Sequence, residues 1–106
     1  MKIAFVTIVF AAIAALTITA AAQPPTAENL YDEGQAAYDK ADYGTAIARW
    51  QAAYDLSNAS GLLLNLAQAK RLSGDCVGAI TTYKRFIEAD PTVYQKPLAE
   101  EFVREL

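Results

Sequence analysis

Apolar residues follow two patterns along this chain, and the first is a nearly uninterrupted run at the N-terminus. From residue 27 onward the apolar positions are spaced three or four apart, which is typical of amphipathic helices that pack against one another. The sequence therefore predicts an all-α fold. The expected helices cover residues 27 to 40, 43 to 56, 60 to 73 and 76 to 89, and a last helix begins near Pro97 with Leu98, Phe102 and Leu106 on its apolar side.

The helical pattern repeats after 33 residues, so that Ala46 is answered by Ala79 and Trp50 by Tyr83. Small and large residues that recur in order at a period of about 20 to 50 residues indicate a repeat architecture. Gly34 lies inside a helix, and such a glycine usually indicates the close approach of a neighbouring helix. The residues expected to pack the helices together are Leu30, Gly34, Tyr43, Ala46, Ile47, Trp50, Ala53, Leu63, Ala67, Ala79, Ile80 and Tyr83.

In this register the chain resembles the tetratricopeptide repeat (TPR) family, whose repeats are about 34 residues long. Residues 27–59 resemble one repeat, residues 60–93 a second, and residues 94–106 a capping helix. The run LLLNLAQAKRLSGDCVGAITTYKRFIEADP is also similar to exported TPR proteins of the bacterial cell envelope. Ala37 and Asn58 depart from the family pattern. The resemblance implies a short α-solenoid, in which the first helix of each pair lines a concave face that binds a peptide or helix of a partner.

The first helix of each pair carries a second stripe beside its packing residues. Its members are Tyr31, Gln35, Tyr38, Leu64, Asn65, Gln68 and Arg71, and we expect them to line the partner-binding groove. Aromatic, amide and guanidinium groups together suit a peptide backbone and apolar side chains. Tyr31 and Tyr38 could equally serve only to cover the core, since a Tyr ring suits both places. Family members that grip a C-terminal carboxylate carry Lys and Asn where Tyr31 and Gln35 stand, so capture of an acidic tail is not expected.

The N-terminal apolar run has the anatomy of a secretory signal peptide. Lys2 gives a short basic start, residues 3 to 16 are apolar, and small alanines follow. We expect cleavage after Ala22, export to a bacterial periplasm, and a linker over residues 23–26. The alternative is an uncleaved N-terminal anchor, because residues 3 to 22 are almost long enough to span a bilayer.

Composition and charge narrow the classes of function. The 106 residues include nine basic and twelve acidic side chains, for a net charge of −3, and this mild acidic excess argues against nucleic-acid binding. The chain has no His, no Gly-rich phosphate loop and no spacing typical of metal ligands. We therefore expect no enzyme, no metal or cofactor site, and no small-molecule substrate.

The single cysteine, Cys76, begins the fourth expected helix. We expect it to be a small buried apolar residue at the place that Tyr43 fills in the first unit. The alternative is an exposed thiol, made more acidic by the helix N-terminus and able to cross-link two chains in an oxidising compartment.

Two hypotheses for the function follow. The first is a non-catalytic interaction module, an adaptor or scaffold, that binds another envelope protein. The second is a structural unit that assembles with copies of itself through the repeat ends. Residues 27–56 carry a net charge of −4 and residues 60–93 a net charge of +1, which suits a head-to-tail contact between copies. These charges could equally be solvated faces. A membrane is expected as a partner only if the N-terminal segment stays uncleaved.

Overall fold

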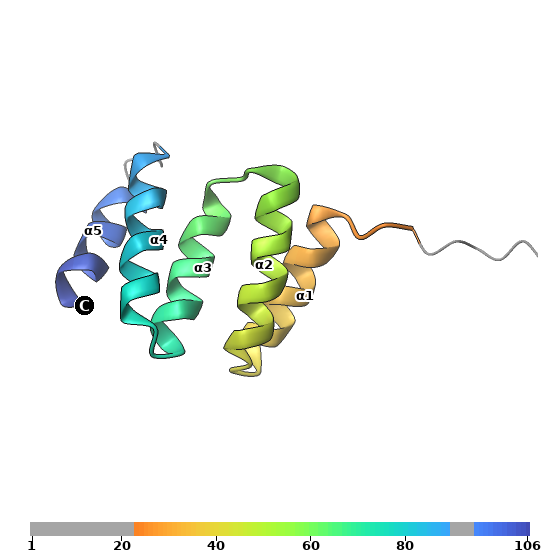
Figure 1. Cartoon of the computed structure of the whole chain (residues 1–106), viewed down its shortest axis with the longest axis horizontal. Helices are drawn as coiled ribbons and strands as arrows, with labels where there is room; N and C mark the ends of the chain where they lie inside the picture. Colours follow the sequence, from red (N-terminus) through yellow and green to blue (C-terminus); the bar gives the residue numbers. More distant parts are fainter. Residues whose placement is uncertain (1–22, 90–94) are drawn as a thin grey trace, which may run out of the picture.

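The computed structural model describes residues 23–89 and 95–106, and these residues form five α-helices and no strand. Each helix packs mainly against the next one in the chain, so that the helices stand side by side in a row, with α1 partly behind α2 (Figure 1). This arrangement confirms the predicted all-α fold. The helices are α1 (Ala27–Asp39), α2 (Tyr43–Ser57), α3 (Gly61–Leu72), α4 (Cys76–Glu88) and α5 (Gln95–Glu105).

The predicted signal segment, residues 1–22, lies outside the described residues. Thr26, at the end of the predicted linker, caps α1, because its side-chain oxygen accepts a hydrogen bond from the Asn29 amide at 3.1 Å. Among the helices that the structure describes, none has both the length and the apolar character needed to cross a bilayer.

The turns inside the two helix pairs are built alike. Ala41 and Gly74, which are 33 residues apart, both have a positive φ, of 58° and 90°. The next residue, Asp42 or Asp75, caps the helix that follows by accepting a hydrogen bond from the amide three positions later, at 3.3 and 2.9 Å. Each aspartate amide also donates to the carbonyl five residues earlier, at 2.9 Å in both turns. The repeat in the sequence is thus also a repeat in backbone geometry.

The buried core follows the same offset. Ala46 and Ala79 are fully buried in α2 and α4, and Trp50 and Tyr83, one turn later, are 2% and 0% exposed. Gly34 lies against Trp50, and a Cβ atom at this position would be 2.5 Å from the indole ring. Real carbon atoms do not approach so closely in a packed interior, so α2 can lie this near α1 only because residue 34 has no side chain.

The expected packing residues divide into two groups by burial. Tyr43, Ile47 and Ile80 are partly buried, and the first two pack against the core. The fully buried members are Leu30, Gly34, Ala46, Trp50, Ala53, Leu63, Ala67, Ala79 and Tyr83.

The two helix pairs end differently. Asn58 ends α2 with a positive φ of 52°, and its amide donates to the Tyr54 carbonyl at 2.7 Å. Asparagine tolerates this left-handed conformation better than most residues, so the first unit ends without a proline. After the second unit, α5 begins at Gln95 rather than near Pro97.

The prediction that Cys76 is buried is wrong, because its side chain is exposed. Cys76 is the first residue of α4, and its neighbour Val77 is 79% exposed, so the start of α4 projects beyond the core. Tyr43 at the equivalent place is partly buried and packs edge-on against Tyr38, with ring centroids 5.5 Å apart. A cysteine side chain is too short to make a corresponding contact.

Candidate functional site

The α1 part of the predicted groove consists of two tyrosines that rest on the core and one glutamine. Tyr31 is 39% exposed and stacks on Trp50 at 6.4 Å, whereas Tyr38 is partly buried and lies 5.3 Å from the same indole. The indole nitrogen of Trp50 donates to the Tyr31 carbonyl at 3.1 Å. Both tyrosines therefore cover the core and keep part of their surface exposed. Gln35 is partly exposed and donates to Asp39 at 2.9 Å.

The α3 part of the predicted groove is more buried than the α1 part. Asn65, Gln68 and Arg71 are partly exposed, but Leu64 is only 9% exposed and belongs to the core. Leu64 is therefore removed from the predicted groove. The physical reason is position in the row: α3 and α4 have α2 on one side and α5 on the other, whereas α1 lies at an end.

Arg71 lies against α5, a contact that the sequence analysis did not anticipate. Its guanidinium carbon is 4.3 Å from the centre of the Phe102 ring, a cation–π distance. Phe102 in turn stacks on Tyr83 at 5.4 Å with an interplanar angle of 26°. The sequence signal was the apolar stripe of the last helix, but this stripe alone could not show which side chain Phe102 meets.

We call Tyr38, Arg71, Tyr83 and Phe102 the Arg71 cluster. Two of its polar atoms, Arg71 Nε and Tyr83 Oη, are buried and have no hydrogen-bonding partner among the described residues. Burial raises the pKa of Tyr83 above its ordinary value of 10.0, and the nearby Arg71 guanidinium acts in the opposite direction. Tyr38 is close enough to Tyr83 to act on it electrostatically, and it raises the pKa slightly further. The cluster thus draws side chains from α1, α3, α4 and α5.

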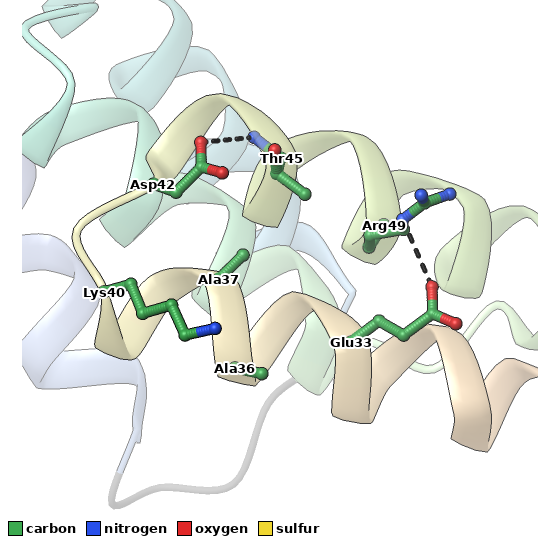
Figure 2. Close-up of a pocket in the computed structure, with 7 residues that line it drawn as sticks. All are labelled: Glu33, Ala36, Ala37, Lys40, Asp42, Thr45 and Arg49. Atoms are coloured by element: carbon green, nitrogen blue, oxygen red, sulfur yellow. Dashed lines mark hydrogen bonds and ion pairs between the residues drawn. The ribbon is translucent and has the colours of Figure 1, made fainter.

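A shallow pocket of about 370 Å³ lies on α1 and α2 at the N-terminal end of the row (Figure 2). Across it, Arg49 Nε and Glu33 Oε2 form an ion pair at 3.1 Å, with both side chains more than half exposed. In the second helix pair the equivalent positions hold Leu66 and Thr82, which are 1% and 2% exposed. The pocket therefore occupies the face that a preceding helix would cover, and its lining is Ala36 and Ala37 together with five polar residues, Glu33, Lys40, Asp42, Thr45 and Arg49.

Thr82 can be buried because its hydroxyl group has hydrogen-bonding partners, one of which is the side chain of Lys70. Lys70 Nζ donates to Thr82 Oγ1 at 2.9 Å, and Thr82 Oγ1 donates to the Gly78 carbonyl at 2.8 Å. Lys70 is thereby turned to the contact between α3 and α4, whereas its neighbour Arg71 is turned to α5. Of these two adjacent cations, Arg71 is the one that belongs to the predicted groove.

Within residues 23–89 and 95–106, no three His, Cys, Asp or Glu side chains are grouped so that they could hold a metal ion. A comparison with protein-family models finds no match. A comparison with curated proteins also finds no relative.

Proposed function

We propose that this chain is a non-catalytic interaction module of TPR type, a short α-solenoid of two repeats and a capping helix, which binds a segment of another protein. The observation that carries the proposal is the 33-residue repetition of turns and buried contacts. This repetition places the partly exposed side chains of Tyr31, Gln35, Gln68 and Arg71 on the first helices of the two pairs.

The chemistry of these exposed groups supports binding of a protein segment. Tyr31 offers a rigid aromatic surface whose packing on Trp50 already limits its motion, so little conformational entropy is lost on binding. Gln68 can donate to and accept from a peptide backbone. Tyrosine and arginine are also enriched among the residues that dominate binding energy at protein interfaces.

The proposal includes export, to the periplasm of a bacterium, because residues 1–22 have the pattern of a signal peptide. The partner is then another protein of the cell envelope. If the segment stays uncleaved, the same module is held at the membrane.

Self-assembly through the repeat ends is less well supported. A preceding helix pair would have to cover Glu33 and Arg49, whose exposed ion pair would lose its hydration in such a contact. Removing paired charges from water often costs more than their mutual attraction returns. The polar N-terminal end is therefore better suited to solvent than to a stacked copy.

Photo-crosslinking in the exporting cell tests the proposed function. The photoreactive residue replaces Gln68 on α3, and in a matched control it replaces Gln51 on α2, which is also a partly exposed glutamine. Mass spectrometry then identifies the captured protein. We expect a different envelope protein to be captured from residue 68 and not from residue 51. Capture of only the same chain, or equal capture from both positions, would contradict the proposal.

A further inference from the structure

Arg71 is a positive charge without a partner at the surface proposed to bind another protein. The one ion pair among the described residues joins Arg49 to Glu33, so no described carboxylate lies within ion-pairing distance of Arg71. Its Nε atom is buried without an acceptor, as is the hydroxyl of Tyr83 beside it. The Arg71 guanidinium and the Tyr83 hydroxyl interact with each other, and this interaction acts to lower the pKa of Tyr83. A guanidinium that has lost part of its hydration and has gained no carboxylate partner is incompletely compensated.

The surrounding residues fix the orientation of this charge. The guanidinium lies over the Phe102 ring at 4.3 Å, and Phe102 is itself held by stacking on Tyr83. A planar guanidinium held in this way can present its terminal nitrogens to a carboxylate as a two-pronged donor. Because less side-chain motion is lost on binding, a held guanidinium binds more tightly than a free one of the same charge.

Three carboxylates on α1 and at the start of α2 have partners of their own. Asp39 accepts from Gln35 and Asp42 caps α2, while Glu33 pairs with Arg49 at the end of the row. Since no described carboxylate lies within ion-pairing distance of Arg71, its positive charge is open to a carboxylate of a partner.

We propose that Arg71 binds the side-chain carboxylate of an aspartate or glutamate in the partner segment, with the ring of Phe102 beside it. This inference rests on the proposed function. The acidic residue is internal to the segment rather than its C-terminus, because Arg71 lies on α3, in the middle of the row. In the row, α1 and α2 precede α3, and Arg71 itself contacts Phe102 of α5, so helices lie on both sides of Arg71.

A peptide selection tests this assignment. The full chain, purified from exporting cells, is used to select binders from a displayed library of random peptides about a dozen residues long. Binding of the selected peptides is measured for the parent, for Arg71→Met, which keeps an unbranched side chain to cover Phe102, and for Arg49→Met as the matched control. Circular dichroism and melting curves show whether each variant is folded, and Arg71→Gln, which also removes the charge and has the same expected loss of binding, serves as a second variant if Arg71→Met is not.

We expect the selected peptides to share an aspartate or glutamate at one position. Its replacement by the corresponding amide should weaken binding to the parent about tenfold or more, and Arg71→Met should weaken binding of the acidic peptide similarly. The two changes together should be no worse than either alone, because both remove the same pair. Arg49→Met should change neither affinity.

Four results would overturn the inference. Peptides that shift the nuclear magnetic resonance (NMR) signals of Gln35 and Gln68 but carry no shared acidic residue would leave the proposed function standing without this role for Arg71. Loss of binding on amidation of the peptide C-terminus, with no effect of the side-chain change, would assign the carboxylate to the chain end. Peptides that bind away from α1 and α3, or a selection without binders, would count against the proposed function as well.

Discussion

In the first helix pair a glycine, Gly34, makes room for the large ring of Trp50, whereas the second pair has Ala67 and the smaller Tyr83 at the same two positions. The small and the large residue change together, so the space between the helices is filled in both pairs. The two aromatic residues also differ in their polar atoms. The indole nitrogen of Trp50 donates to the Tyr31 carbonyl, while the Tyr83 hydroxyl is buried without a partner.

The two pairs differ more strongly at the face that points along the row. Glu33 and Arg49 are exposed in the first pair, and Leu66 and Thr82 are buried at the equivalent positions of the second. The backbone is the same, so the difference follows from the neighbours: α2 covers α3, and no described helix covers the corresponding face of α1. The comparison shows that a repeat period determines the contacts within a unit, while position in the row determines exposure.

Among the substitutions considered, the largest loss of stability is expected at this face. Leu66→Ala should lower the free energy of unfolding by about 2–5 kcal/mol, because it leaves a cavity between α2 and α3. Glu33→Ala at the equivalent position should change it by less than about 1 kcal/mol, because an exposed ion pair contributes little. Chemical denaturation of both variants measures the difference. Equal losses would mean that the assignment of a free end and an interior face is incorrect.

The next effect concerns the glycine under Trp50. Gly34→Ala should destabilise the protein by about 1–3 kcal/mol, because the added methyl group overlaps the indole ring. Gly44→Ala is the matched control, since a Cβ there meets nothing within 4 Å, and the better helix propensity of Ala should make it neutral or stabilising.

Trp50→Tyr in the Gly34→Ala background should recover part of the loss, because it recreates the pair found in the second unit. A double-mutant cycle measured by denaturation gives this coupling. Strictly additive effects would show that residues 34 and 50 do not share the space described here.

Substitutions in the turns of the two helix pairs should have smaller effects on stability. Ala41→Gly should stabilise the protein by up to about 1 kcal/mol, because alanine with a φ of 58° is strained and glycine is not. Gly74→Ala should destabilise it by a similar amount, because φ there is 90°. Thermal melting of the two variants should give shifts of opposite sign. Shifts of the same sign would indicate that the two turns are not equivalent.

The smallest effect expected near neutral pH is that of Tyr83→Phe, which removes a buried hydroxyl without a partner. The change should be neutral or stabilising by about 1 kcal/mol. Because the pKa of Tyr83 is raised in the folded state, the unfolded chain loses this proton first, and the parent should lose stability as pH rises above about 10. The variant should lose less over that range. Denaturation curves at neutral and alkaline pH test both statements, and a parent and variant with the same pH dependence would contradict them.

Much of the fold could be predicted from the sequence because its signals are local. The 33-residue offset and Gly34 act through neighbours within one helix pair, and the capping residue Thr26 acts within the first turn of α1. The all-α fold and the close approach at Gly34 follow from them.

The candidate site was less predictable, since it depends on contacts between units. Tyr31 and Leu64 are equivalent in the repeat, but Leu64 is nearly buried because its unit has helices on both sides. The contact between Arg71 and Phe102 depends on where α5 docks, which the repeat period does not specify. Cys76 was expected to fill the place of Tyr43, and its short side chain leaves it exposed.

In the proposed function, the first helices of the two pairs carry the binding face. The most direct test is an NMR titration of the isotope-labelled chain with the segment of the protein captured from residue 68. We expect shifts of the side-chain signals of Gln35, Gln68 and Arg71, with those of Gln51 and Arg49 unchanged. Shifts concentrated on α2 and α4, or in the pocket at Glu33 and Arg49, would contradict it.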